Sequence, residues 1–318
     1  MGINLEFERP LAGLREQLEG LDRELAAHPS DELRARREAL AGELQRQAAE
    51  IYAELNRWQK VQVARYQRRP QTLDYAKAIF TDFVELHGDR TFGDDKAIVG
   101  GPARLEGQVV MIVGHQRGHD TKEAVERNHG QPHPEGFRKA LRLFRLAEKF
   151  GMPLLTFLDS SGAYPGLEDE QRGQAWALAD NIAALTELRV PIIASVIGEG
   201  GSGGSLAIGV ADRLLMLEHS VFSVATPEAA ASIVWKDSRH APEAAEALKL
   251  TAPDLLELNV ADRIVPEPPG GAHADQATTA ASLREALVDE LGALRAVPLE
   301  RLLVERYQKY RRIGTFYE

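Results

Sequence analysis

The chain has 318 residues, of which 44% are hydrophobic and 27% are charged, and its formal net charge at pH 7 is −10. These fractions are typical of a soluble globular protein, and the acidic balance argues against broad nucleic-acid binding, which needs a basic surface. There is no cysteine, which excludes disulfides, thiol nucleophiles and cysteine zinc sites, and no apolar run approaches the ~20 residues of a membrane span, so we expect a cytoplasmic protein.

The first predicted region is a helical hairpin between Pro10 and about Arg69, where good helix formers dominate. The segment from His28 to Asp31 separates the two helices, and Ser30 or Asp31 can cap the second one. The apolar stripe can be buried by packing of the two helices on each other or by docking on another subunit, and the sequence leaves both open. Its members are Leu11, Leu14, Leu18, Leu21 and Leu25, then Leu33, Leu40, Leu44, Ile51 and Leu55.

Strands and helices alternate through the rest of the chain, which indicates an α/β domain with helices packed on a largely parallel sheet. The predicted helices cover 76–85, 134–150, 169–188, 206–211 and 226–235, with two further short helices and a long C-terminal helical region. The predicted strands cover 97–105, 109–115, 153–158, 190–197, 213–218, 221–225 and 260–265.

A polar segment over 116–134 is predicted as a long loop, and such loops are often functional. The histidines in and beside it include two pairs spaced i,i+4, but these pairs lie in a predicted strand end and loop rather than on a helix, and no carboxylate completes a ligand set, so a metal site is not expected. Arg117, Lys122 and Arg127 can contact an anion, or they can be solvated surface charges. The histidines are His115, His119, His129 and His133.

The stretch from Val190 to Gly209 is the one in which a site is predicted. It begins with an apolar, β-branched run expected to form a strand buried on both faces. Five glycines follow within seven positions, and then a helix begins, so unpaired backbone N–H groups would face an anion or a developing oxyanion. The loop over 159–166 also follows a buried strand, and in a parallel sheet the two loops would converge at one edge. The glycines are Gly198, Gly200, Gly201, Gly203 and Gly204.

Three interpretations of these glycines remain open on the pattern alone. Gly198, Gly200 and Gly203 match the G-x-G-x-x-G dinucleotide fingerprint, with Glu218 near the position of a ribose-binding acid. An oxyanion hole for a carbonyl that becomes an enolate is the second interpretation. In the third, the glycines serve only close packing of helix on strand.

An ordered set of segments resembles the α subunits of the bacterial acetyl-CoA carboxylase carboxyltransferase, and it covers essentially the whole chain. The resemblance implies an α/β, crotonase (ClpP/enoyl-CoA hydratase)-like fold with a repeated β-β-α core, an N-terminal helical hairpin and C-terminal helices. It divides the chain into a partner-docking hairpin over 1–75 and a carboxyltransferase domain over 76–318. The matching segments are 94–101, 114–118 with 121–123, 134–136 with 138–142, 162–166 with 172–174, 196–204 with 206–209, and 264–268 with 270–273.

The function implied by the resemblance is that of a transferase active only with a β subunit, commonly as an α2β2 assembly. It would move the carboxyl group of carboxybiotin, carried on a biotin carboxyl carrier protein, to acetyl-CoA, giving malonyl-CoA for fatty acid biosynthesis. Biotin carboxylase and its ATP belong to the wider complex. No cofactor or metal is expected in this chain, because the family's four-cysteine zinc ribbon lies in the β subunit. A propionyl substrate stays open, since the acyl pocket would lie largely on the partner.

The resemblance also implies the site. Gly203 and Gly204 are expected to form the oxyanion hole for the biotin enolate, where each N–H donor is worth roughly 3–4 kcal/mol. The enolate can take its proton from the acetyl methyl group, so no side-chain base and no His–Asp pair are expected. Where the family often has proline, this chain has Ser161, which leaves that loop less restricted. The expected substrate-binding residues are Ser205, Gly162, Ala163, Tyr164, Gly200, Gly201 and Lys122.

Two alternatives belong to other functional classes. A ClpP-like serine protease shares this kind of scaffold and would use Ser202. Residues 200–204 match the letters of G-x-S-x-G, but no histidine is placed to serve Ser202. A non-catalytic scaffold that acts only through the leucine hairpin leaves the paired glycine loops unexplained.

Overall fold

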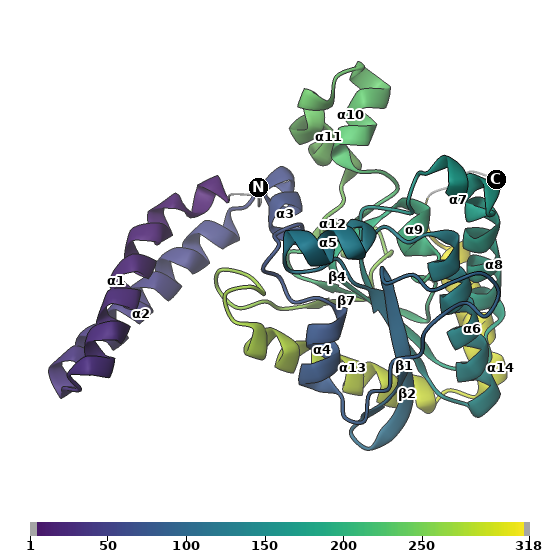
Figure 1. Cartoon of the computed structure of the whole chain (residues 1–318), viewed down its shortest axis with the longest axis horizontal. Coiled ribbons are helices and arrows are strands. Elements are labelled where there is room, and N and C mark those ends of the chain that lie inside the picture. Colours follow the sequence, from purple (N-terminus) through teal and green to yellow (C-terminus); the bar gives the residue numbers. More distant parts are fainter. Residues whose placement is uncertain (1–4, 315–318) are drawn as a thin grey trace.

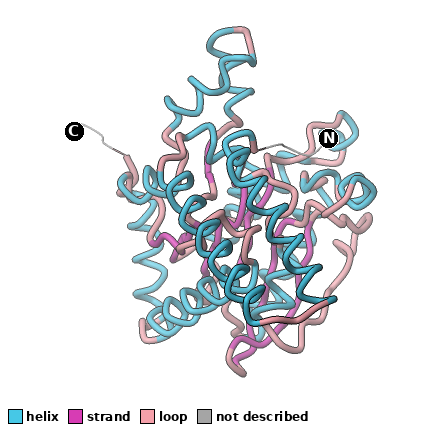
Figure 2. Tube along the Cα trace, turned by 90° about the vertical axis from the view of Figure 1, so that its left-hand side faces the viewer, coloured by secondary structure: helices cyan, strands magenta, loops and turns pink. Residues whose placement is uncertain are grey.

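A seven-stranded sheet with helices on both faces forms the centre of the molecule in the computed structural model, which describes residues 5–314 (Figure 2). The outer ends of the two predicted regions, residues 1–4 and 315–318, lie outside the described residues. The strands are β1 (Ile98–Leu105), β2 (Gln108–His115), β3 (Leu154–Ser160), β4 (Ile192–Gly201), β5 (Arg213–Leu217), β6 (Val221–Ser223) and β7 (Arg263–Val265).

The strand order is β1-β2-β3-β4-β5-β7, and β6 pairs with the last residues of β4, where Glu199 faces Val221. Only the β1–β2 pair among the described strands is antiparallel. The predicted, largely parallel sheet is therefore confirmed. Because parallel strands point the same way, the carboxyl ends of β3, β4 and β6 lie at one edge of the sheet.

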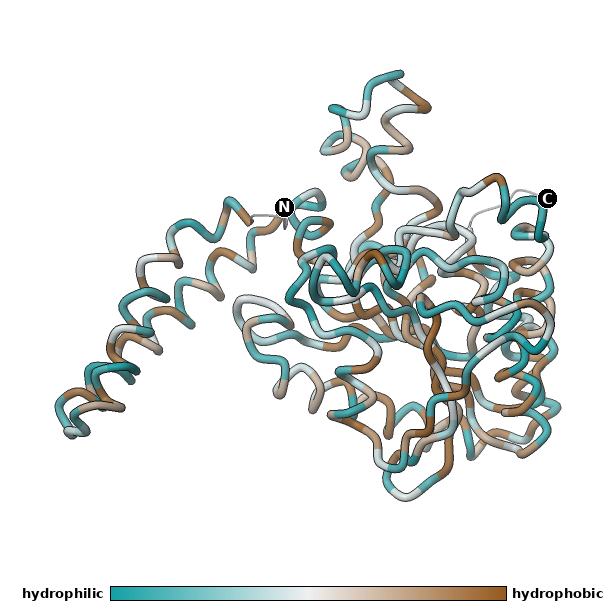
Figure 3. Tube along the Cα trace, in the orientation of Figure 1, coloured by the Kyte–Doolittle hydropathy of each residue, from teal (hydrophilic) through white to brown (hydrophobic). Residues whose placement is uncertain are grey.

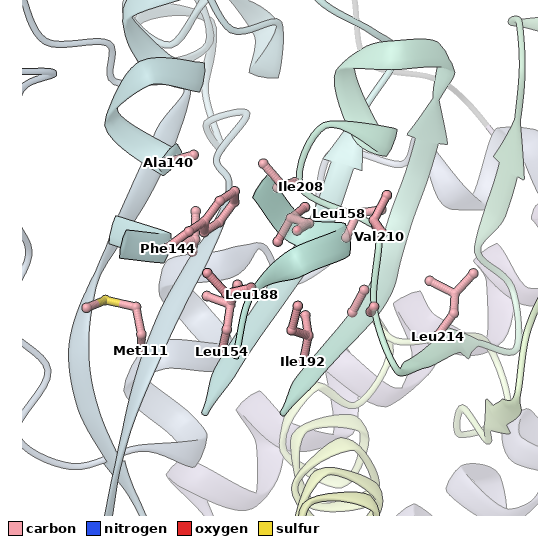
Figure 4. Packing of buried hydrophobic residues seen from close by; sticks show 14 of the residues in the cluster. Met111, Ala140, Phe144, Leu154, Leu158, Leu188, Ile192, Ile208, Val210 and Leu214 are labelled. Carbon is pink, nitrogen blue, oxygen red and sulfur yellow. The ribbon is translucent and has the colours of Figure 1, made fainter. Parts of the chain in front are cut away.

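The sheet is buried on both faces. Successive side chains of each strand point to opposite sides, so each strand contributes residues to two apolar clusters. On β2, Met111 and Val113 join the apolar cluster that contains Phe144 of the helix over Pro134–Phe150. Figure 4 shows this cluster, which packs against the inner parts of β3 and β4. Val110 and Ile112 belong instead to the cluster on the other face, which contains Leu287.

The helices cover the two faces of the sheet and form two projections from it (Figure 1). They are α1 (Arg9–Ala27), α2 (Asp31–Ala53), α3 (Arg57–Ala64), α4 (Thr72–Ile79), α5 (Thr121–Glu126), α6 (Pro134–Phe150), α7 (Leu167–Gln171), α8 (Gln174–Glu187), α9 (Ser202–Leu206), α10 (Pro227–Trp235), α11 (Ala241–Leu248), α12 (Ala252–Glu257), α13 (Gln276–Arg295) and α14 (Leu299–Arg311). Short 3₁₀ turns lie at Glu6–Glu8 (η1), Asn128–Gly130 (η2) and Ser238–His240 (η3). Helices α6 and α8 pack together on one face of the sheet, and α4 and α13 on the other.

The helix predicted over 76–85 is displaced toward the N-terminus and becomes α4. Its start is fixed by a reciprocal cap, in which the Asp74 carboxylate accepts from the Gln71 backbone N–H at 2.7 Å. The chain leaves the helix at Phe80, and Thr81 then forms an antiparallel bridge with Arg104 of β1. Pairing with the sheet edge has replaced the last helical turns.

Two further elements differ from the prediction because of local backbone chemistry. The helix expected over 169–188 is divided into α7 and α8 by Gly173, whose φ of 83° is left-handed and ends a regular helix. The loop expected over 116–134 contains the short helix α5. Asp120 caps α5 by accepting from the Glu123 N–H at 2.8 Å.

The N-terminal hairpin, α1 and α2, projects from the body of the protein (Figure 1). Ser30 caps α2 by accepting from the Leu33 N–H at 3.2 Å, as the sequence predicts. Leu11 and Leu21 are buried between the helices or at the base of the hairpin, so self-packing satisfies part of the apolar stripe. Hydrophobic residues alternate with polar ones along both helices, whereas the strands are hydrophobic over longer stretches (Figure 3).

The buried carboxylate of Glu8 ties the two helices together at the base of the hairpin and also reaches His273 of the body. It accepts hydrogen bonds from Tyr52 Oη at 2.5 Å and Arg15 Nη1 at 2.6 Å, and His273 Nε2 lies 3.5 Å away. Burial acts to raise the pKa of Glu8, but its contacts with His273, Arg15 and Tyr52 outweigh burial and lower that pKa to about 2.

We expect this anchor to make stability sensitive to acid. The folded pKa lies below the unfolded value, so Glu8 contributes on the order of 3 kcal/mol above pH ~4.5 and loses it as the pH falls through about 2. Urea unfolding at pH 5 and pH 2.5 measures the loss, which Glu8→Gln should reduce. Glu6→Gln, at an exposed position, is the control. Equal acid losses in the wild type and Glu8→Gln would contradict the assignment.

Candidate active site

The two predicted loops meet at the carboxyl edge of the sheet. A Cβ atom placed on Gly204 would lie 2.5 Å from the backbone nitrogen of Ala163, and one on Gly201 would lie 2.3 Å from the Ser161 carbonyl oxygen. Only glycine allows backbones to approach this closely. Gly201 and Gly204 therefore have to be glycine, because a side chain at either position would clash with the backbone of residues 161–163.

The glycine run is not a loop throughout, because β4 continues to Gly201 instead of ending at Ile197. Pairing of Glu199–Gly201 with Val221–Ser223 of β6 extends the strand, and α9 begins directly afterwards, earlier than the helix predicted over 206–211. Gly203 and Gly204 consequently lie in the first turn of α9. Backbone N–H groups in a first turn have no partner within the helix.

This strand extension also bears on the dinucleotide interpretation. That fingerprint needs its glycines in the turn between a strand and a helix, but Gly198 and Gly200 lie within β4. A Cβ on Gly198 would meet the Asp159 carboxylate at 2.3 Å, and one on Gly200 would meet the Phe222 ring at 2.5 Å. Both glycines serve close packing inside the fold.

A pocket of about 360 Å³ opens where the loops meet. It brings together four of the predicted site residues, namely Gly162 and Ala163 from one loop and Gly203 and Gly204 from the other. The remaining lining residues are Gln131, Ser161, Leu178, Ser202, Val224, Ala225, Thr226 and Ala229.

The other predicted site residues lie outside this lining. Ser205 is buried, and its hydroxyl accepts from the Gly201 N–H at 2.9 Å and donates to the Ser160 carbonyl at 3.3 Å, which ties the ends of β4 and β3 together. Gly200 and Gly201 are buried in β4. Tyr164 is partly exposed, and Lys122 is an exposed residue of α5. Their contact with a substrate stays a prediction.

Buried polar groups brace the edge of the sheet beneath the pocket. The Asp159 carboxyl accepts from the Glu199 N–H at 3.1 Å and from Arg117 at 3.2 Å, and burial raises its pKa. His115 is fully buried, and burial lowers its pKa to about 3, so the ring is neutral at physiological pH. Its Nδ1 accepts from the Asp159 N–H at 3.3 Å. These groups hold the strand ends in place.

A His–Asp pair, which the sequence analysis does not expect, lies beside the pocket. His133 Nδ1 and an Asp169 carboxylate oxygen are 2.5 Å apart, and the His133 ring lies 4.7 Å from the ring of Tyr164. The two residues are 36 positions apart, so only the fold reveals the pair. Neither residue lines the pocket, so the pair supports the 162–166 loop from outside. Among the described lining residues there is also no histidine beside Ser202, as a serine protease would need.

Several residues that line this pocket are not predicted from the sequence. Val224 to Thr226 follow β6, a strand parallel to β4. Residues that follow parallel strands meet at one edge of the sheet, so this segment could have been predicted in the same way as the other two loops. Gln131 donates from Nε2 to the Ser161 hydroxyl at 3.1 Å, and Leu178 comes from α8. No sequence pattern indicates these last two.

Known proteins resemble this chain over nearly its full length. The family model for acetyl co-enzyme A carboxylase carboxyltransferase-like proteins matches residues 4–314. Two relatives are each named acetyl-coenzyme A carboxylase carboxyl transferase subunit alpha. The one from Geobacter metallireducens is 54% identical and covers 99% of this chain and 98% of its own length. The one from Thermus thermophilus is 52% identical and covers 99% of both chains.

Solved structures agree on the fold. A transcarboxylase 12S structure has a TM-score of 0.55 at 21% identity, over 66% of this chain and 41% of that one. The β subunit of geranyl-CoA carboxylase from P. aeruginosa has a TM-score of 0.55 at 20% identity, over 77% and 46% of the two chains. These carboxyltransferases have the crotonase-like fold expected from the sequence. The chain belongs to the acetyl co-enzyme A carboxylase carboxyltransferase-like family.

Proposed function

We propose that the chain is the α subunit of a carboxyltransferase that works with a β subunit and transfers a carboxyl group to acetyl-CoA, forming malonyl-CoA. The names of relatives that are more than half identical over nearly the full length support this activity. The pocket between the two loops supports the location that we propose for its site.

The position of Gly203 and Gly204 carries the proposal. Both residues lie in the first turn of α9 and line a pocket of about 360 Å³. Loss of the carboxyl group from carboxybiotin leaves negative charge on the ureido oxygen, and preorganised N–H donors at that oxygen lower the barrier by roughly 3–4 kcal/mol each. We assign Gly203 and Gly204 as these donors, with the Ser205 N–H as a third candidate and residues 162–164 as the wall for biotin.

Exposed apolar residues at the rim of this pocket support the proposed partners. Val224 lines the pocket with 79% of its surface exposed, and Leu206 of α9 is 37% exposed. We propose that a β subunit covers this side in an α2β2 assembly, brings acetyl-CoA and carries the zinc. Carboxybiotin then enters on its carrier protein after charging by biotin carboxylase, and the chain needs no cofactor of its own.

The proposed location is the cytoplasm, where malonyl-CoA would supply fatty acid synthesis. Among residues 5–314, no helix has the length and apolar character needed to cross a bilayer. We also propose that the N-terminal hairpin, within residues 1–75, docks a partner, which its projection from the body would allow.

The reverse reaction, from malonyl-CoA and biotin, tests the function. Acetyl-CoA formation is measured for this chain alone, for the β subunit alone and for the mixture. We expect turnover only in the mixture, because the oxyanion donors and the acyl-CoA site lie on different chains. An α–β complex that is verified by gel filtration but inactive would overturn the proposal, and full activity of the isolated chain would overturn the division between subunits.

A further inference from the structure

A second cavity, of about 330 Å³, lies next to the candidate active site and shares none of its lining residues. Its walls come from the segment between α3 and α4, from the segment between β2 and α5, and from η2. Asp159 and His129 line this cavity, and Ser161 and Gln131, two residues further along the same segments, line the first pocket. The two cavities therefore have a common wall.

Three guanidinium groups line the second cavity, and two of them have strong partners. Arg69 makes two hydrogen bonds of 2.8 Å to the Glu267 carboxylate. Arg65 contacts Glu199 at 2.7 Å and Glu228 at 2.6 Å. The charges of these two arginines are thus balanced within the protein.

Arg117 is the least compensated of the three. Its only carboxylate partner among the described residues is Asp159, through a single contact of 3.2 Å. Burial raises the pKa of Asp159, although the charge of Arg117 acts to lower it. About a quarter of the Arg117 side chain, 24%, remains exposed toward the cavity.

The backbone that carries Arg117 is fixed by the buried side chain of Gln71. Gln71 Oε1 accepts from the N–H groups of Arg117 at 3.0 Å and Gly118 at 2.7 Å, and its Nε2 donates to the Gly118 carbonyl at 3.0 Å. Beside His129, a Cβ on Gly130 would lie 2.5 Å from Arg117 Cγ, so this glycine makes room for the arginine stem. The guanidinium is therefore held in place before any ligand arrives.

His129 is a second polar residue of the cavity lining, and its backbone has an unfavourable conformation. Asn128 and His129 are consecutive non-glycine residues with left-handed φ values of 48° and 54°. Such residues persist only where the surrounding structure holds them, and they cluster at functional sites. His129 is an exposed residue that lines the cavity, and within residues 5–314 its imidazole makes no side-chain hydrogen bond.

We propose that this cavity binds a small anion that carries a carboxylate, held by the Arg117 guanidinium and the His129 imidazole. The planar guanidinium matches the two oxygens of a carboxylate, and about 330 Å³ is large enough for a short carbon chain. The inference goes beyond the proposed carboxyl transfer and does not depend on it, because binding can be measured without turnover.

Calorimetric titration of the full chain with sodium malonate, succinate and phosphate, at ionic strength held constant with sodium chloride, tests the site. We expect saturable binding of a dicarboxylate, weakened about tenfold or more by Arg117→Gln, since charged hydrogen bonds contribute ~1.5–3 kcal/mol each. Arg117→Lys keeps the charge but loses the paired N–H donors of the planar guanidinium, so this variant should bind the dicarboxylate less tightly than the wild type. Lys77→Gln removes an exposed charge from the neighbouring α4 and should bind normally.

A second pair of variants separates the role of the imidazole from backbone strain. His129→Gly and Asn128→Gly each place glycine at a left-handed position and relieve backbone strain there, and Asn128→Gly also removes the contact of the Asn128 amide with Asp95 at 3.5 Å. Only His129→Gly should also weaken dicarboxylate binding. Absence of saturable binding, normal binding by both Arg117→Gln and His129→Gly, or an equal loss in Lys77→Gln would each overturn the proposal. Phosphate binding as tight as that of the dicarboxylates would overturn the choice of a carboxylate.

Discussion

Replacing Gly204 by alanine is expected to reduce the kcat of carboxyl transfer by about 10²–10³-fold, the usual effect of losing one oxyanion donor. The new methyl carbon would lie 2.5 Å from the Ala163 nitrogen and 2.5 Å from the Gly162 carbonyl carbon. Both atoms belong to backbone, which cannot turn aside as a flexible side chain can. The first turn of α9 must therefore move away from the 162–163 loop, and its N–H groups move with it. Steady-state kinetics of the complex with the β subunit measures the effect.

Gly203→Ala is the matched control for this change. A Cβ at that position meets only Leu178 Cδ1, at 3.8 Å, so the backbone can stay where it is while the methyl group enters the pocket. We expect a higher KM for the carboxyl donor with an unchanged melting temperature. Retained binding of Gly204→Ala to the β subunit shows that its fold is intact. Turnover at the wild-type rate by Gly204→Ala would refute the oxyanion assignment.

Replacing Arg69 by methionine is expected to destabilise the protein by about 3–5 kcal/mol, because it leaves a buried carboxylate without its counter-ion. Glu267 is fully buried, and although burial acts to raise its pKa, the charge and hydrogen bonds of Arg69 lower that pKa to about 2. The Glu267 carboxylate also accepts from the His219 N–H at 3.0 Å and the Ala272 N–H at 2.6 Å. Arg69 therefore helps to hold two backbone segments.

The size of this effect is measured by urea unfolding at pH 7. Arg239→Met is the control, since it breaks an Arg–Asp pair whose arginine is 89% exposed and should change stability by less than about 1 kcal/mol. The double variant Arg69→Met/Glu267→Gln should recover part of the loss, because the uncompensated charge is gone. A loss for Arg69→Met no larger than that of the control would show that the buried pair contributes little.

Elements with their own end signals could be predicted from the sequence. Helix α6 has the predicted bounds, because Pro134 suits its first position and Gly151 takes the left-handed conformation after its end, with a φ of 63°. Thr226 likewise caps α10 by accepting from the Ala229 N–H, a role typical of threonine at the start of a helix. Elements that depend on distant partners could not be predicted. The end of β4 is set by pairing with β6, which no local pattern indicates.

The part of the candidate site that lies directly after the strands could be predicted from the sequence. Gly162 and Gly203 belong to segments that follow buried parallel strands, and the structure brings them into one pocket. Which glycines open into the pocket could not be predicted, since that depends on where β4 stops. The pairing of His133 with Asp169 and the cavity around Arg117 need residues from separate segments, and spacing along the chain carries no signal for either.

The anchor of the hairpin bears on how the chain matures while it is being synthesised. Helices α1 and α2 are neighbours in sequence, and contacts of this local kind form early and quickly as a chain emerges N-terminus first. The anchor is different, because Tyr52 meets His273, which is 221 positions further along. A nascent chain that ends before His273 would therefore carry a folded arm that cannot dock, and the arm would take its final place only near the end of translation.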